Sequence, residues 1–193
     1  DYLRSLGKEP KENLKETFKA FTLEQAAKYY RENYGVVLSV NEIVDGVNKM
    51  VERYYAETVK LKPGIEVFLE KLKAKGVKMC IATVTDKPLV EISLDRLGVR
   101  DYFSEVFTCA SVGHSKEEPH IYREAQKHLG TSKKETVVFE DVVHALRTAK
   151  SDGFVTIGVF DVHEENQEKL KMIADYYIEN YSDFEKFWNR INK

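Results

Sequence analysis

Apolar and polar residues follow a helical period through the first third of the chain. Thr22-Leu23-Glu24-Gln25 is a capping box, the pattern in which a hydroxyl and a glutamine satisfy free amides at a helix start, and Gly35 ends the run that follows. A second capping box, Ser39-Val40-Asn41-Glu42, opens a longer run with one apolar face. This region has no strand-like alternation, so the pattern predicts a small all-helical domain over residues 1–60.

After Pro63-Gly64 the pattern changes to short apolar runs that alternate with amphipathic segments. Strand and helix joined by short connections are typical of a parallel sheet with helices on both faces. The sequence therefore predicts an α/β domain over residues 61–193. We expect its strands at 77–82, 106–109, 137–139, 154–160 and 176–178, and its helices at 65–75, 86–97, 119–129, 142–150, 164–173 and 184–191.

The composition is that of a globular chain and argues against two classes of partner. Of the 193 residues, 42% are hydrophobic and 32% are charged, with a net charge of -2 and both signs mixed along the chain. We see no basic stripe for nucleic acid and no apolar run long enough for a membrane. Cys80 and Cys109 lie far apart in strand-like segments, so we expect reduced thiols in a cytoplasmic protein, although a disulfide stays open at this point. We take a monomer as the default oligomeric state.

Polar side chains follow several of the expected strands, and ligands of open α/β sheets bind beyond the carboxyl ends of strands. Thr83 follows one strand, Glu140 and Asp141 follow another, and Lys116 lies in a polar loop between them. A hydroxyl and an ammonium can donate to phosphate oxygens, and carboxylates are the hard oxygen ligands that Mg2+ prefers. Each has a simpler interpretation alone, as a strand end, a solvated lysine or helix-start acids. Their shared edge favours a site for phosphate and metal.

At these residues the sequence resembles a known family. Three stretches resemble successive motifs of the haloacid dehalogenase superfamily, in the subclass with a helical cap that includes the β-phosphoglucomutase-like phosphatases: KPGIEVFLEKLKAKGVKMCIATVTDK, GHSKEEPHIYREAQKHLG and FEDVVHALRTAKSDGF. The resemblance runs from about Pro63 to about Asp161, with the helical segment before it in the place of the cap. It implies a doubly wound, Rossmann-like core with a small helical cap domain.

The resemblance also implies roles for individual residues. Thr83 and Lys116 would be catalytic groups that bind the phosphate, with Val84 beside Thr83 in the substrate site. Asp141 would be a Mg2+ ligand, with Glu140 as a further ligand or support. The loop departs from the family pattern: Glu117 stands where a proline is usual after the lysine.

His120 stands where the family usually has an acid before the isoleucine. Because Lys116 and Pro119 are kept, we expect the loop to function, with the extra acids weakening anion binding. We expect no metal site at the histidines, since His114, His120, His144 and His163 lack a familiar ligand spacing.

One motif of the family is missing from these 193 residues. The family nucleophile is the first aspartate of an Asp-x-Asp pair after the first strand, and this sequence contains no such pair. The resemblance places that strand centrally in the sheet, where its loss would leave unpaired backbone groups. The chain begins with Asp1 and not with Met, which favours a preceding segment of roughly 20 residues. The alternative is a chain that truly lacks it.

These observations leave several functions open. The first is a Mg2+-dependent phosphatase that acts on a small phosphorylated metabolite through an aspartyl-phosphate, with the nucleophile outside these residues. The second is a catalytically inactive relative that binds a phosphorylated ligand or a protein partner. A phosphomutase is a further alternative, and a dehalogenase is less favoured because it needs no metal.

Overall fold

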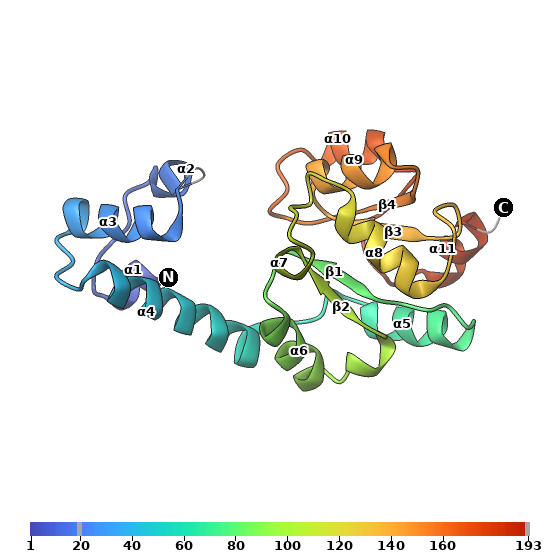
Figure 1. Ribbon diagram of the computed structural model, residues 1–193, viewed down its shortest axis with the longest axis horizontal. Helices are drawn as coiled ribbons and strands as arrows, with labels where there is room; N and C mark the ends of the chain where they lie inside the picture. Colours follow the sequence, from blue (N-terminus) through green and yellow to red (C-terminus); the bar gives the residue numbers. More distant parts are fainter. Residues whose placement is uncertain (19–20, 192–193) are drawn as a thin grey trace. The chain divides into compact units, whose positions relative to one another are not determined.

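The computed structural model describes residues 1–18 and 21–191, and the chain divides into two compact units, Asp1–Val59 and Lys60–Lys193. Figure 1 shows the elements of both units. Among the described helices, we find none with the length and apolar character that crossing a membrane requires. The two units are taken separately below.

The first unit is helical, with both predicted capping boxes in place. Thr22 Oγ1 accepts from the Gln25 amide at 3.2 Å while the Gln25 side chain accepts from the Thr22 amide at 2.7 Å, and Ser39 and Glu42 repeat the arrangement. Tyr29, Tyr30 and Tyr34 pack with Phe18 and Phe21 in a ring cluster, and the buried core is Leu3, Ala27, Val36 and Ile43. The elements are α1 (Tyr2–Ser5), α2 (Leu14–Phe18), α3 (Leu23–Tyr34), α4 (Val40–Arg53) and the π-helical turn η1 (Tyr54–Thr58).

The described strands of the second unit form two parallel ladders. One pairs β1 (Ile81–Thr83) with β2 (Val106–Thr108). The other has the order β3 (Val137–Glu140), β4 (Val155–Val159) and β5 (Tyr176–Ile178). Glu140, the last residue of β3, is in register with Gly158. Within the described residues no ladder joins β1 to β3.

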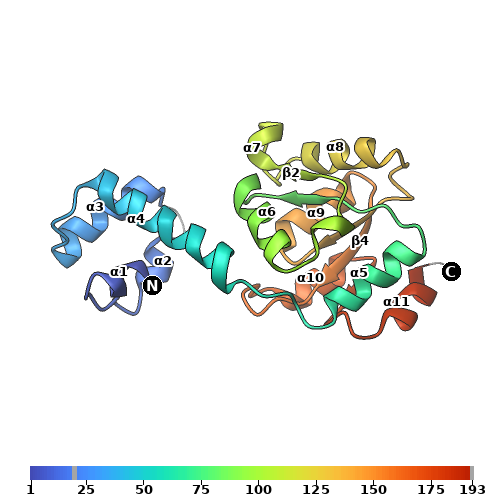
Figure 2. The same cartoon turned by 90° about the horizontal axis from the view of Figure 1, so that it is seen from below.

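Helices cover both faces of the three-stranded sheet, and successive side chains of β4 point to opposite faces. Ile157 and Val159 pack with α5 and α11, whereas a side chain at Gly158 would meet the Leu170 and Ala174 side chains at the end of α10. Figure 2 shows the same layers from a second side. The helices are α5 (Ile65–Ala74), α6 (Lys87–Arg96), η2 (Arg100–Tyr102), α7 (Cys109–Val112), α8 (His120–Leu129), α9 (Val143–Ser151), α10 (Gln167–Ile173) and α11 (Phe184–Ile191).

The sequence misplaced the ends of several elements, for local reasons. The first strand was expected at 77–82, but it begins at Ile81, because the Val77 amide donates to Leu72 O and completes the C-terminal turn of α5. Cys109 was expected in a strand and instead begins α7, because Thr108 caps that helix through a capping box with Ser111. Cys80 and Cys109 are both free thiols.

The helix expected from residue 164 begins three residues later, at Gln167. The Glu164 side chain accepts from the backbone amides of Val143 and Asn166. The bond with Asn166 holds residues 164–166 in a turn ahead of the helix. This fits the general competition between side-chain and helical hydrogen bonds.

Candidate active site

A buried ion pair joins two of the residues that the sequence singled out. Lys116 Nζ lies 2.6 Å from Glu140 Oε1, and the two side chains are 14% and 6% exposed. Lys116 comes from the loop before α8, and Glu140 is the last residue of β3. A charged hydrogen bond with so little solvent fixes the position of the ammonium group.

Tyr122 of α8 completes this pair. Its hydroxyl donates to Glu140 Oε1 at 2.8 Å and also lies 3.3 Å from the Ala145 carbonyl oxygen. Burial raises the pKa of Tyr122 far above its ordinary value, and the charge of Glu140 adds to the shift. The phenol therefore stays protonated and donates to the carboxylate at neutral pH.

A second cluster is more open. Lys62 Nζ lies 2.6 Å from Asp161 Oδ2 and 3.7 Å from Asp141 Oδ2, and it donates to the Phe160 carbonyl oxygen at 3.1 Å. The side chains of Lys62 and Asp141 are each 39% exposed, and that of Asp161 is 24% exposed. The hydrogen bond from Lys62 is the main cause that lowers the pKa of Asp161. Two carboxylates that follow adjacent strands thus share one cation.

The structure places Thr83 at the end of β1, where its hydroxyl oxygen accepts from the Thr85 amide at 3.1 Å. Val84 follows it with 68% of its surface exposed. Thr83 therefore shapes the turn after β1, and Val84 is open to a ligand. The structure brings Lys116 and Glu140 into direct contact, whereas Asp141, the residue after Glu140, lies in the Lys62 cluster.

The carboxylates beyond β3 and β4 are chemically suited to Mg2+, which prefers oxygen ligands and keeps several waters. Asp141 is exposed enough to meet a hydrated ion, whereas Glu140 is already held by an ammonium and a phenol. The charge of Asp141 also adds to the raised pKa of the partly buried Tyr181, whose main cause is desolvation of the phenol. Asp141 is thus the better placed of the two predicted ligands.

The sequence did not identify Lys62 or Tyr122 as members of these clusters. Lys62 only precedes a Pro-Gly turn, and Tyr122 looked like one more apolar residue of an amphipathic helix. The position of Asp161 directly after an apolar run was the one available signal, the same that pointed to Asp141.

The parallel ladders, the helices on both faces and the polar groups at strand ends agree with one family. The family model of haloacid dehalogenase-like hydrolases matches residues 3–159 of this sequence. This chain belongs to that family. The expected Rossmann-like architecture and the expected family are both confirmed.

Relatives of this haloacid dehalogenase-like hydrolase carry phosphatase names among others. A phosphorylated carbohydrates phosphatase from Thermotoga maritima is 31% identical over 152 residues, which cover 75% of this chain and 69% of the relative. Protein CbbY from Cereibacter sphaeroides is 30% identical over 153 residues, 74% of this chain and 66% of the relative. The chain thus matches about two thirds of the length of each.

Solved structures share the fold. A candidate β-phosphoglucomutase from Thermotoga maritima superposes with a TM-score of 0.84 at 24% identity, covering 97% of this chain and 88% of that one. A β-phosphoglucomutase from Clostridium difficile gives 0.69 at 19% identity, covering 99% and 86%. At these identities the likeness establishes the fold of the hydrolase alone.

Proposed function

We propose that this chain supplies the phosphate-binding and metal-binding groups of a Mg2+-dependent phosphatase for a small phosphorylated carbohydrate. The observation that carries the proposal is the buried Lys116–Glu140 pair, with Asp141 as the next residue beyond β3. The name of the Thermotoga maritima phosphatase supports the substrate class.

Phosphate binding and metal binding fall to different side chains in this proposal. Glu140, which also accepts from the Tyr122 hydroxyl, holds Lys116, whose remaining N–H groups can donate to phosphate oxygens. The Thr83 hydroxyl, at the end of β1, is a further donor to phosphate. Asp141, with Glu140 beside it, would hold Mg2+, which when bound supplies positive charge that stabilises the transferring phosphoryl group.

The nucleophile must come from elsewhere. The printed sequence has no Asp-x-Asp pair, and within the described residues β1 and β3 are not paired with each other. We infer that a strand outside these 193 residues brings an aspartate to this edge. Its carboxylate would attack phosphorus and form an aspartyl-phosphate as the bond from phosphorus to the sugar oxygen breaks. The second aspartate of the same Asp-x-Asp pair would protonate that oxygen and then activate the water that hydrolyses the intermediate.

A second candidate function is phosphate binding without turnover. The absence of an Asp-x-Asp pair from the printed sequence favours it. Such a protein would be stabilised by a phosphorylated ligand and would release no phosphate.

The test begins with the intact mass of the purified natural protein, compared with 22.3 kDa for these residues. Phosphate release from a panel of phosphorylated carbohydrates is then measured with and without Mg2+. The phosphatase proposal expects a greater mass and Mg2+-dependent turnover that Asp141→Asn abolishes. A matching mass with ligand-induced stabilisation and no turnover would establish the binding protein instead.

A further inference from the structure

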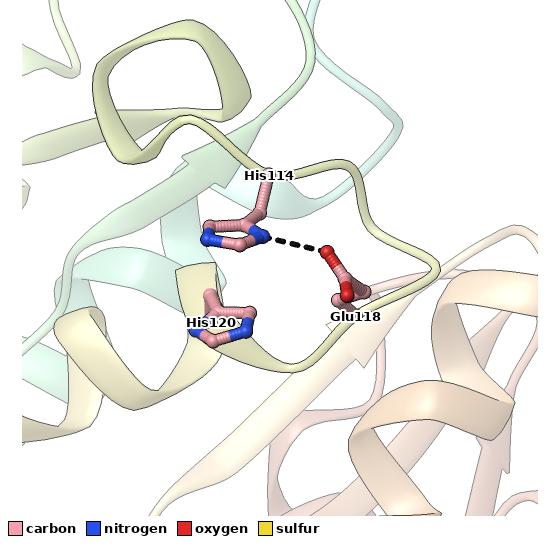
Figure 3. A group of neighbouring side chains, drawn as sticks. All are labelled: His114, Glu118 and His120. Carbon is pink, nitrogen blue, oxygen red and sulfur yellow. Dashed lines mark hydrogen bonds and ion pairs between the residues drawn. The ribbon is translucent and has the colours of Figure 1, made fainter.

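Three side chains with metal-ligating atoms meet in the loop between α7 and α8, and none of them belongs to the two clusters above. His114 follows Gly113, which ends α7, Glu118 precedes Pro119, and His120 is the first residue of α8. One ligating atom from each lies within 4.8 Å of the other two. Figure 3 shows the group.

The two imidazole rings lie against each other, and the carboxylate lies beside one of them. His114 Nδ1 lies 2.6 Å from Glu118 Oε2, and the rings of His114 and His120 stack with centroids 3.7 Å apart and planes at 18°. Figure 3 shows one nitrogen of each ring on the side where the Glu118 carboxylate lies.

An ion pair between His114 and Glu118 accounts for only part of this arrangement. Their side chains are 41% and 55% exposed, and an exposed pair of this kind contributes little to stability. It also leaves unexplained why the second imidazole lies stacked on the first. A bound cation would use both rings and the carboxylate together.

We propose that His114, Glu118 and His120 form a binding site for a divalent transition metal of the Zn2+ class. Two imidazole nitrogens and one carboxylate oxygen are the donors that Zn2+ accepts, whereas Mg2+ and Ca2+ prefer oxygen alone. Three protein ligands leave a fourth position for water. The sequence predicts no metal here, since these histidines lack a familiar ligand spacing, and the proposed site differs from that expectation.

The side chains must rotate to accept the ion. Two ligands about 2.0–2.1 Å from a tetrahedral Zn2+ lie about 3.3 Å apart, so Glu118 and His114 must separate by less than about 1 Å and the rings must tilt toward each other. Their exposure allows this. Glu124, one turn after His120 on α8, lines the same surface hollow as both histidines and adds negative charge that attracts a cation.

The ion would restrain the loop that carries Lys116. His114 and Glu118 flank Lys116 by two residues on each side, so a metal held by both closes the loop around it. The site differs from the one proposed for Mg2+ in its residues and its donor chemistry. The binding itself does not rest on the proposed phosphatase activity.

The test is a titration of Zn2+ into the intact protein in excess Mg2+, followed by calorimetry, with Co2+ absorption as a report on nitrogen ligands. We expect one ion per chain. Losing a ligand should weaken binding by more than the roughly 10- to 100-fold typical of a lost supporting partner, so His114→Gln and His120→Gln should each do so. His163→Gln removes another exposed imidazole and should leave the affinity unchanged.

A second measurement needs no variant and so does not depend on how well a variant folds. Amide hydrogen exchange of the unaltered protein should slow within residues 114–120 when Zn2+ is added. Zn2+ binding that survives the His114→Gln/His120→Gln double variant, or that disappears with Asp141→Asn while residues 114–120 stay unprotected, would overturn the proposal. Because neither readout uses turnover, an inactive enzyme would leave the result intact.

Discussion

Two lysine–carboxylate clusters in the second unit follow strand ends, yet they differ in burial. Lys116 and Glu140 are 14% and 6% exposed and have a buried phenol as a third member. Lys62 joins Asp141 and Asp161 at 24–39% exposure. A buried pair has a fixed geometry and is costly to break, whereas an exposed pair exchanges its partners readily. The first cluster is therefore suited to hold a phosphate-binding lysine in place, and the second to exchange its lysine for a metal ion.

The largest expected effect is the loss of the buried lysine. Lys116→Met leaves the Glu140 carboxylate buried with its phenol partner alone, so we expect the free energy of unfolding to fall by about 3 to 5 kcal/mol. Urea unfolding at neutral pH measures the change. The double variant Lys116→Met/Glu140→Leu should recover most of the loss, because no unpaired charge stays buried. A loss no larger than that of Lys62→Met would remove the distinction between the clusters.

The phenol of the buried cluster should have the next largest effect. Tyr122→Phe removes a donor to the Glu140 carboxylate, and we expect a loss of about 1 to 3 kcal/mol in the free energy of unfolding. The same substitution in a Glu140→Gln background should cost less, since the charged acceptor is gone. A double-mutant cycle measures the coupling. A coupling near zero would mean that Tyr122 acts through packing alone.

A carboxylate outside both clusters tests how partly exposed cations act together. Asp152 lies 2.9 Å from Arg123 Nε and 2.8 Å from Lys133 Nζ, and these bonds, with that of Arg123 the larger, lower its pKa from 3.8 to about 2. The paired form therefore stabilises the fold above pH 3.8, and this stability is lost as the pH falls toward 2.

We expect Asp152→Asn to cost about 1 to 2 kcal/mol at neutral pH, a range that allows for solvent around the two cations. The difference in urea midpoint between variant and parent should narrow as the pH falls below 3.8 toward 2, because the Asp152 carboxylate of the parent becomes protonated over that range. A difference that stays constant with pH would contradict the electrostatic origin.

The parts of the fold that the sequence predicted are those governed by neighbouring residues. The capping boxes at Thr22 and Ser39 formed as expected, since each involves residues three positions apart. The apolar run 176–178 predicted β5 within its observed bounds. The predicted ends of elements were wrong where a side-chain hydrogen bond competed with the apolar pattern. Thr108 is an example, because its side chain caps α7.

The site was predictable in its types of residue but not in its contacts. Lys116 and Glu140 are separated by 24 residues, and Lys62 and Asp161 by 99, so no local pattern connects either pair. The carboxylates could be predicted as site residues because they follow strands, and parallel strands bring their carboxyl ends to one edge of the sheet. The choice of lysine partner for each carboxylate depends on the path of loops, which the periodicity does not encode.

The smallest expected effect belongs to the open cluster. Lys62→Met removes an exposed cation from two carboxylates, and we expect a change below about 1 kcal/mol in the free energy of unfolding, smaller still in molar salt. The informative result is metal affinity, measured by calorimetric titration of Mg2+. Because the ammonium competes with a cation for Asp141 and Asp161, Lys62→Met should bind Mg2+ more tightly, while Lys62→Arg should not. Weaker Mg2+ binding in Lys62→Met would mean that the lysine organises the carboxylates for the ion, and the two clusters would then work in the same way.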